Sequence, residues 1–331
     1  MRRFKMQKVY VTDYEYASLK EEEGEINKIN ARLIPVQSLT EDEVIANCKD
    51  ADGLLNQYAP ISRKVIENLP NLKVVGRYGV GVNTIDMEAA TDHGICVVNV
   101  PDYCMDEVSD QAFALIIACM RKVVLLNNQV KNRGWDYKLG KPIHRLRGQK
   151  LGLLGFGRIP RSLAEKAKPF GFELLVYDPF VKDDIVKEFG GKLLTLDELL
   201  QSADVISVHV PLMKNTEHMI STKEFGMMKK TAIIVNTSRG AIIDESAMIE
   251  ALQHKQIGGA GLDVLETEPV GKDNPLLDMD NVIITPHISW YSEESEVELK
   301  QKAARGVAEV LQGKVPTYLV NKAVVGTLSL K

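Results

Sequence analysis

Short apolar runs rich in β-branched residues alternate with helix-like stretches along the whole chain. Before residue 100 the strand candidates are KVYVTD (8–13), ARLIPV (31–36), DGLLNQ (52–57), LKVVGR (72–77) and GICVVNV (94–100). The pattern resumes with LGLLGF (151–156), FELLVYD (172–178), DVISVHV (204–210), AIIVNTS (232–238), GAGLDV (259–264) and NVIITP (281–286). Apolar strands that alternate with helices are typical of parallel sheets with crossover helices. We therefore predict an α/β fold with two parallel-sheet units.

Helix signals fall between these strands. Thr40 and Glu43 form a predicted capping box, Ser221 and Glu224 form another, and Asp244 is a candidate N-cap. A long helical segment from Met105 to about Arg133 separates the two series of strands, and a final helix is predicted over 293–312.

Composition excludes several classes of protein. A chain of 331 residues exceeds the size at which a single core usually keeps growing, and 45% hydrophobic residues suffice for two cores. The formal net charge is -4, and no block of Lys and Arg suggests nucleic-acid binding. The richest apolar run, 112–120, is too short to span a bilayer. We expect a cytoplasmic protein that binds neither nucleic acid nor membranes.

The four cysteines are widely spaced and form no Cys-x-x-Cys pair. Reduced thiols are therefore expected in place of disulfides or a zinc site, and no metal is predicted.

A glycine-rich turn follows the strand at 151–154. Gly155 permits a tight turn, and Gly157 lets a pyrophosphate approach the backbone at the positive end of the next helix. Phe156, Arg158 and Ile159 belong to the same turn and are also expected to contact the cofactor. Asp178 ends the next strand, where its carboxylate can accept both ribose hydroxyls of NAD and would repel the 2′-phosphate of NADP. The turn predicts an NAD site.

Pro160 stands where the third glycine of such a turn is expected. A proline is acceptable in the first turn of a helix because its missing N–H would have no partner there. The ring could widen the contact between helix and strand and weaken cofactor binding.

Three polar residues occur at or just beyond the carboxyl ends of later strands, where open α/β sheets bind ligands. They are Arg239, Glu268 and His287. Separately, each has a simpler explanation, as a surface ion-pair partner, a solvated loop acid and a helix-end residue. Together they suit the reduction of a 2-oxo acid, in which Arg holds the carboxylate, His transfers a proton and Glu stabilises the imidazolium.

Several stretches resemble the D-isomer-specific 2-hydroxyacid dehydrogenase family over nearly the whole chain. They are GRYGVGVNTID (76–86), NVP (99–101), HVPL (209–212) with Thr216, NTSRG (236–240), GLDV (261–264) through Glu268-Pro269, and TPH (285–287). Asn83 stands where Asp is more usual in the family. The resemblance implies that Arg239, Glu268 and His287 are the catalytic set. It also implies that the substrate contacts Arg77, Tyr78, Gly79, Val80, Gly81 and Trp290, the loop at 78–81 offering backbone N–H groups to the carboxylate.

The resemblance implies further cofactor contacts as well. They are His209, Val210, Pro211, Thr216, Thr237, Ser238, Asp263 and His287. The implied architecture is a flavodoxin-like substrate domain made of 1–102 and 296–331, with a Rossmann domain for NAD at 103–295 inserted between two hinge helices. Catalysis would then occur in a cleft that closes over the substrate, and a homodimer would form through the cofactor domain.

The stretch PHISWYSE (286–293) looks like the C-terminal binding protein branch of the family. Trp290 is either core packing or an aromatic wall that favours longer or apolar substrates. Because that branch includes NAD-regulated corepressors, an NAD(H)-sensing binding protein remains an alternative to an enzyme. A phosphoglycerate, hydroxypyruvate or glyoxylate reductase is the alternative among enzymes, although Arg77 is the only obvious extra cation for a phosphate, and it could equally brace the loop.

Overall fold

The computed structural model describes residues 6–326 and divides into two compact units. The first combines the described residues up to Cys104 with those from Ser292 onward, and the second is Met105–Tyr291. Each unit is an α/β fold built on a parallel sheet, as the strand pattern predicts.

The described part of the first unit contains a five-stranded parallel sheet in the order β2-β1-β3-β4-β5. Its strands are β1 (Gln7–Val11), β2 (Ala31–Pro35), β3 (Gly53–Asn56), β4 (Val74–Arg77) and β5 (Cys96–Val98). Its helices are α1 (Lys20–Ile26), α2 (Glu41–Asn47), α3 (Arg63–Glu67), α4 (Met87–Asp92), α12 (Glu293–Leu311) and the 3-10 turn η5 (Lys322–Gly326).

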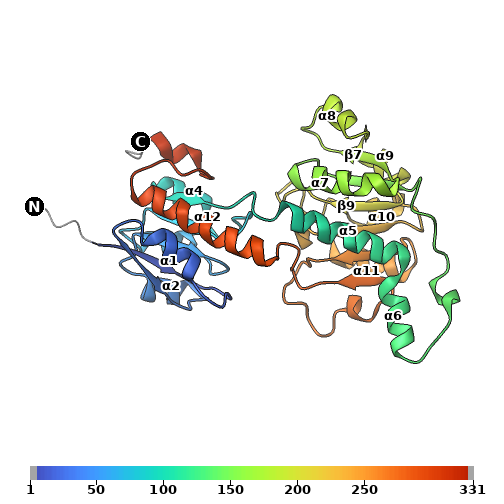
Figure 1. Cartoon of the computed structure of the whole chain (residues 1–331), viewed down its shortest axis with the longest axis horizontal. Coiled ribbons are helices and arrows are strands. Elements are labelled where there is room, and N and C mark those ends of the chain that lie inside the picture. The colour runs from blue at the N-terminus through green and yellow to red at the C-terminus, as the bar shows by residue number, and fades with distance from the viewer. Residues whose placement is uncertain (1–5, 327–331) are drawn as a thin grey trace, which may run out of the picture. The chain divides into compact units, whose positions relative to one another are not determined.

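Helix α12 returns from the far end of the sequence to cover this sheet beside α1 (Figure 1). It approaches the sheet closely at two glycines. A Cβ on Gly76 would lie 2.6 Å from Val307 Cγ2, and one on Gly53 would lie 3.0 Å from Val307 Cγ1. The missing side chains let the helix pack directly on β3 and β4. The other face of the sheet packs on a cluster that includes Val44, Ile66 and Ala89.

The described part of the second unit contains a seven-stranded parallel sheet in the order β12-β11-β10-β9-β6-β7-β8. Its strands are β6 (Lys150–Leu154), β7 (Glu173–Tyr177), β8 (Lys192–Leu193), β9 (Val205–Val208), β10 (Ile233–Asn236), β11 (Gly259–Leu262) and β12 (Val282–Ile284). The order reverses between β6 and β9, which is where such sheets bind ligands at the carboxyl ends of their strands. The sequence pattern missed the two-residue β8.

The second unit also contains helices and 3-10 turns, and some of the helices cover the two faces of the sheet. The helices are α5 (Met105–Arg121), α6 (Val123–Lys131), α7 (Arg158–Ala167), α8 (Asp183–Glu188), α9 (Leu196–Ser202), α10 (Thr222–Met227) and α11 (Glu245–Gln253), with 3-10 turns η1 (Tyr137–Gly140), η2 (Lys168–Phe170), η3 (Gly240–Ile242) and η4 (Pro275–Asp278). One face packs on α5 and α7 through Leu115 and Leu163, and the other packs on α9, α10 and α11 through Leu199, Phe225 and Met248.

The predicted helix starts are confirmed, but one predicted helix is divided. Capping boxes form at Thr40 and Ser221, and the Asp244 side chain caps α11. The segment predicted as one helix from Met105 to about Arg133 breaks at Lys122, whose φ of 52° is left-handed. A residue in that conformation cannot continue an α-helix, so α6 leaves the direction of α5.

Candidate active site and cofactor turn

The glycine turn has the backbone geometry that its sequence requires. Gly155 has a φ of 91°, and its N–H donates to the Tyr177 carbonyl at 2.8 Å. A Cβ there would lie 3.2 Å from the His209 carbonyl. The positive φ and the close approach to β9 together favour glycine.

Gly157 is the N-cap of α7 and has no side-chain capping bond. A Cβ at Gly157 would meet no atom within 4 Å, so the N-terminus of α7 is open at this residue. Pro160 is the third residue of that helix and is buried. It therefore lies in the first turn, where the absence of an N–H removes no intrahelical bond.

Asp178 holds the turn from the end of β7. Its Oδ2 accepts the Phe156 N–H at 2.8 Å, and its Oδ1 accepts the N–H groups of Phe180 at 2.8 Å and Val181 at 3.2 Å. A carboxylate offers about four lone-pair sites. It therefore keeps acceptor capacity for a ribose hydroxyl while it supports the turn.

Two loops beside the turn carry most of the other predicted cofactor residues. The His209 ring points inward to the hydroxyl of the buried Ser207, at 2.8 Å from Nε2, and burial lowers the pKa of His209 to about 3. Thr216 Oγ1 donates to the Pro211 carbonyl at 2.6 Å and closes that loop. Ser238 Oγ donates to the Val210 carbonyl at 2.7 Å, which joins the loop after β9 to the loop after β10. Because its pKa is lowered to about 3, His209 is neutral at physiological pH.

Thr237 is buried, and its hydroxyl has no hydrogen-bond partner within residues 6–326. Buried hydroxyls in folded proteins are normally bonded. The open space at Gly157, the spare acceptor sites of Asp178 and this hydroxyl all fit a dinucleotide, so the residues present suit NAD.

Arg239 and Glu268 lie on two loops that touch through their backbones. Arg239 follows β10, and its carbonyl accepts the Asn236 side-chain amide at 2.9 Å. A Cβ on the adjacent Gly240 would lie 1.9 Å from the Leu265 carbonyl carbon. Only glycine allows this approach, which sets the loop of Arg239 against the loop of Glu268. The sequence contains Gly240 in a matching motif, but its role appears only in the packing.

His287 and Glu268 form a hydrogen-bonded pair. His287 Nδ1 lies 2.7 Å from Glu268 Oε2, and Glu268 Oε1 accepts the Leu265 N–H at 3.0 Å. Burial opposes ionisation of Glu268, but the bond to His287, the His287 and Arg239 charges and the Leu265 N–H together hold its pKa below its usual range. With Nδ1 facing a carboxylate, the imidazole has Nε2 to exchange a proton.

Asp263 holds the loop that carries His287. The structure shows its carboxylate accepting the Thr285 hydroxyl at 2.5 Å and the N–H groups of Ile288 at 3.0 Å and Ser289 at 2.8 Å. His287 has a left-handed φ of 51°, and its N–H donates to the Asp263 carbonyl at 2.9 Å. The family resemblance implies a cofactor contact for Asp263, whereas this loop contact has no local signal in the sequence.

The predicted substrate loop belongs to the first unit. Tyr78 follows β4 with its ring buried, and Gly79 has a φ of 132°. A Cβ on Gly79 would lie 2.1 Å from Arg77 Nη1, so the guanidinium packs on the loop backbone. Val80 is exposed, and its carbonyl accepts the Asn99 side-chain amide at 2.7 Å. Gly81 is partly exposed beside it.

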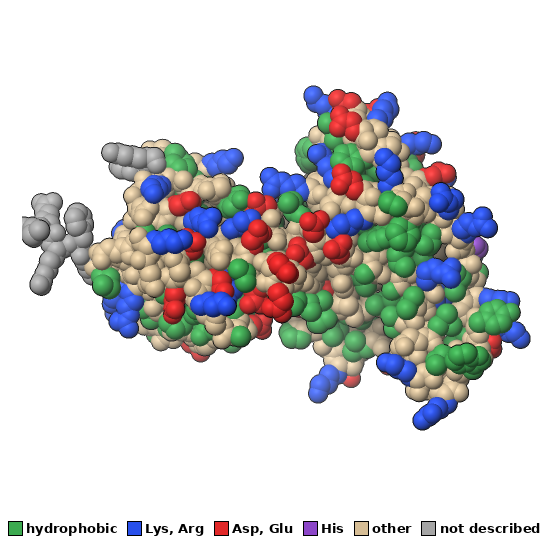
Figure 2. All heavy atoms as spheres, in the orientation of Figure 1, with side chains coloured by type: hydrophobic (Ala, Val, Ile, Leu, Met, Phe, Trp, Pro, Cys, Tyr) green, Lys and Arg blue, Asp and Glu red, His purple; other side chains and the backbone are tan. Residues whose placement is uncertain are grey.

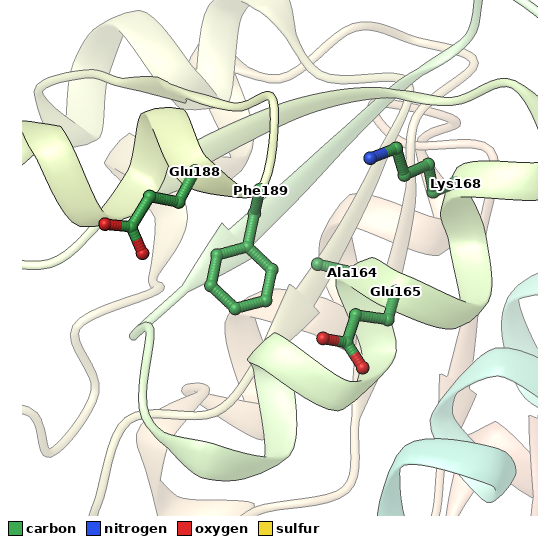
Figure 3. Close-up of a pocket in the computed structure, with 5 residues that line it drawn as sticks. All are labelled: Ala164, Glu165, Lys168, Glu188 and Phe189. Carbon is green, nitrogen blue, oxygen red and sulfur yellow. The ribbon is translucent and has the colours of Figure 1, made fainter.

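Trp290 lies at the end of the second unit, half-buried, with its ring edge-to-face against Tyr291 at a centroid distance of 5.5 Å. A pocket of about 230 Å³ lies between α7 and α8 (Figure 3). It is lined by Ala164, Glu165, Lys168, Glu188 and Phe189, none of which belongs to the predicted site.

No helix within residues 6–326 is both long and apolar enough to cross a membrane. The same part of the chain holds no group of three or more His, Cys, Asp or Glu side chains that could bind a metal ion.

Comparison with known proteins identifies relatives over most of the chain. The model of the D-isomer specific 2-hydroxyacid dehydrogenase NAD-binding domain matches residues 113–289. A glyoxylate reductase of Korarchaeum cryptofilum is 39% identical over 85% of this chain and 86% of that protein. A D-3-phosphoglycerate dehydrogenase of Methanocaldococcus jannaschii is 40% identical over 96% of this chain but only 60% of that protein.

Solved structures show the same architecture. The D-lactate dehydrogenase of Aquifex aeolicus, crystallised with NAD and lactic acid, superposes with a TM-score of 0.83, at 29% identity over 92% of this chain and 96% of that chain. The turn and the His287–Glu268 pair thus occur in a chain whose relatives reduce 2-oxo acids or oxidise 2-hydroxy acids. The protein belongs to the D-isomer-specific 2-hydroxyacid dehydrogenases and is an NAD-dependent oxidoreductase.

Proposed function

We propose that Arg239, Glu268 and His287 carry the 2-hydroxyacid dehydrogenase reaction of this chain. The observation that supports this most strongly is the 2.7 Å contact between His287 Nδ1 and Glu268 Oε2. Reduction of a 2-oxo acid adds a hydride to C2 and a proton to the carbonyl oxygen. Bound NADH supplies the hydride, and the residues of the chain have to hold the substrate and deliver the proton.

Arg239 binds the substrate as a bidentate donor. A planar guanidinium matches the geometry of a carboxylate and can also polarise the neighbouring carbonyl. We propose that the backbone N–H groups of the Tyr78–Gly81 loop bind the same carboxylate. The guanidinium of Arg77 packs on this loop, which favours a bracing role for Arg77 over direct recognition of a substrate phosphate.

His287 is the acid in reduction and the base in oxidation. Its Nε2 gives the proton to the developing alkoxide, and in the reverse reaction it takes the proton from the hydroxyl. Glu268 is ionised at neutral pH because its pKa is held below its usual range, so a negative charge faces Nδ1 there. That carboxylate fixes Nδ1 as the hydrogen-bonded nitrogen, which leaves Nε2 for the proton transfer.

The cofactor residues that we propose are the turn Gly155–Ile159, the ribose-binding carboxylate of Asp178, and the loops that carry His209–Pro211, Thr216 and Thr237–Ser238. Asp263 supports the His287 loop and is proposed to reach the nicotinamide end. NAD is preferred over NADP because Asp178 would repel a 2′-phosphate.

The substrate is a small 2-oxo acid. Trp290 is half-buried, so part of its ring can contact a substrate side chain, and it favours longer or apolar substrates. A short-chain glyoxylate or hydroxypyruvate reductase is the alternative, supported by relatives that are glyoxylate reductases.

We propose a homodimer formed through the second unit. No residue of α6 is buried, and apolar side chains gather over α6 and η1 on one face of the molecule (Figure 2). Trp135 is 90% exposed and Tyr137 is 72% exposed. A second copy of this surface would cover them, as isologous dimers do.

All four cysteines are buried and none forms a disulfide in the described residues, which agrees with a reducing cytoplasmic environment.

The experiment is NADH oxidation by the purified protein with glyoxylate, hydroxypyruvate, 3-phosphohydroxypyruvate, pyruvate and bulkier branched, thioether or aromatic 2-oxo acids. We expect turnover with unphosphorylated acids and a preference for apolar side chains that Trp290→Ala reduces by roughly tenfold to a hundredfold. NADH binding without turnover on any acid would contradict the proposal and favour a cofactor-sensing binding protein. Sedimentation velocity tests the dimer in the same sample.

A further inference from the structure

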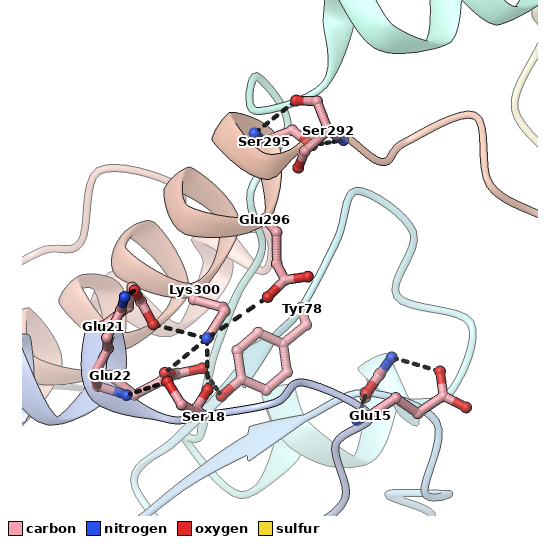
Figure 4. A network of polar contacts seen from close by, with 11 residues as sticks. Glu15, Ser18, Glu21, Glu22, Tyr78, Ser292, Ser295, Glu296 and Lys300 are labelled. Carbon is pink, nitrogen blue, oxygen red and sulfur yellow. Dashed lines mark hydrogen bonds and ion pairs between the residues drawn. The ribbon is translucent and has the colours of Figure 1, made fainter.

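A buried polar network lies directly under the predicted substrate loop and has no part in the reaction described above. It joins Tyr78, Glu22 of α1 and Lys300 of α12 (Figure 4). Glu22 is 0% exposed, and Tyr78 and Lys300 are each 2% exposed. Charged groups are almost never buried to this extent without partners, so their arrangement needs a physical explanation.

Lys300 is mainly the partner of Glu21. Its Nζ lies 2.7 Å from Glu21 Oε2 and 2.6 Å from the Ser18 carbonyl oxygen, and it also lies over the Tyr16 ring. Glu22 Oε2 is farther away, at 3.9 Å from Nζ, and accepts no hydrogen bond from any described residue. Two buried carboxyls thus share one ammonium group, and Glu22 is the poorly compensated member.

The Tyr78 hydroxyl supplies the missing donor. It lies 2.9 Å from Glu22 Oε1 and donates to it. The same residue begins the substrate loop, and its own N–H donates to the Asn56 carbonyl at 2.9 Å. The ring is fixed edge-to-face against Tyr16, at a centroid distance of 5.2 Å. The backbone of the loop is therefore tied through one side chain to a buried carboxyl on α1.

We infer that Glu22 and Lys300 act through the Tyr78 hydroxyl as positioning residues for the Tyr78–Gly81 loop. This inference rests on the proposed use of the loop for the substrate carboxylate. It goes further by naming the residues that hold the loop in the conformation in which its N–H groups can bind. Gly79, with its positive φ, is the flexible point that such an anchor has to control.

The network also makes the loop sensitive to pH. Burial raises the pKa of Glu22 to about 7, against the opposing effects of backbone hydrogen bonds, the Lys300 charge and the Tyr78 hydroxyl. An ionised carboxylate accepts a stronger hydrogen bond than a protonated one. The loop is therefore held more firmly as the pH rises through about 7. The groups that act on Glu22 are Tyr16, Glu21, Tyr78 and Lys300. Farther out in the network, Asp13 acts on Tyr78, Arg77, Tyr58 and Glu296 act on Tyr16, and Glu296 also lies near Lys300.

Two variants test the network, each with a small change of shape. Tyr78→Phe removes only the hydroxyl, and Glu22→Gln keeps the carboxyl shape without its charge. The chain offers a control on β1 of the same sheet, where Tyr10 donates to Asp50 Oδ1 at 2.7 Å and Lys8 pairs with the same carboxylate, which is partly exposed. Tyr10→Phe removes a tyrosine–carboxylate contact away from the loop.

The measurements are amide hydrogen exchange of the peptide that covers the loop, and KM and kcat for the best 2-oxo acid, all on the full-length protein. We expect Tyr78→Phe and Glu22→Gln to speed exchange at Gly79–Gly81 about tenfold and to raise KM about tenfold, with kcat within about twofold. Tyr10→Phe should leave both unchanged. In the wild type, exchange corrected for its intrinsic pH dependence should slow as the pH rises through about 7, and Glu22→Gln should abolish this step.

Exchange in both variants equal to that of Tyr10→Phe would overturn the inference. Faster exchange with an unchanged KM would instead uphold the network as the anchor of the loop and overturn the assignment of the loop to the substrate. The two failures are therefore distinguishable, because exchange reports the loop conformation whether or not a substrate binds there.

Discussion

His287 Nδ1 lies 2.7 Å from Glu268 Oε2, and His287 itself has a left-handed backbone conformation. A φ of 51° at a histidine is uncommon and costs conformational energy. The surrounding bonds offset that cost, since Asp263 accepts three hydrogen bonds from Thr285, Ile288 and Ser289. The hydrogen bonds of Asp263 thus stabilise the loop conformation in which the imidazole pairs with the Glu268 carboxylate.

Replacement of Glu268 by Gln should move the pH dependence of catalysis. The amide can still accept a hydrogen bond from Nδ1, but the negative charge beside the imidazole is lost. We expect kcat/KM for reduction at neutral pH to fall by roughly tenfold to a hundredfold, with a different dependence on pH because the amide carries no charge. The measurement is the pH–rate profile of both proteins from about pH 5 to about pH 9. Superimposable profiles would show that the charge has no role.

The His287–Glu268 pair should also make the stability of the wild-type protein depend on pH in the acid range. The pKa of Glu268 is lowered in the folded protein, so its stabilising contribution is present above the ordinary carboxyl range and is lost as the pH falls through its folded value. Thermal melts of the wild type and of Glu268→Gln should therefore converge at low pH and separate near neutrality. A gap that stays constant with pH would contradict the ionised pair.

Removal of the Asp178 charge should relax the preference for NAD. Asp178→Asn keeps one carbonyl oxygen to accept the Phe156 N–H, whereas Asp178→Ala removes every hydrogen bond that the Asp178 carboxylate accepts. We expect the ratio of kcat/KM with NADPH to that with NADH to rise about tenfold or more in both variants. Only Asp178→Ala should lose appreciable stability. An unchanged cofactor ratio in Asp178→Asn would exclude repulsion of the 2′-phosphate as the cause.

Gly240 should tolerate no side chain. A Cβ there would lie 1.9 Å from the Leu265 carbonyl carbon, so Gly240→Ala has to move the Arg239 loop or the Glu268 loop. We expect a loss of about 1–3 kcal/mol in stability and at least a tenfold loss in kcat/KM. Gly226→Ala on α10 is the matched control, because a Cβ there meets no atom within 4 Å. Equal behaviour of the two variants would remove Gly240 from the positioning of the site.

The sequence predicts much of the fold because its signals are local. Strand composition, the capping residues Thr40 and Ser221, and the glycine turn at Gly155 depend on near neighbours, and the structure has each of them in place. The break at Lys122 was missed because the apolar pattern continues through it. The contact of Gly240 with Leu265 and the bond between Glu21 and Lys300, 279 residues apart, depend on tertiary packing, which no local pattern reports.

The most direct test of the catalytic assignment is NADH oxidation by His287→Ala beside the wild type, with the best 2-oxo acid from the substrate panel and with NADH affinity measured by fluorescence titration. We predict that kcat falls by roughly a hundredfold to ten-thousandfold, because the proton donor is lost, while the affinity for NADH stays within about twofold. Wild-type turnover in His287→Ala would contradict the account, because the proton would then come from another group.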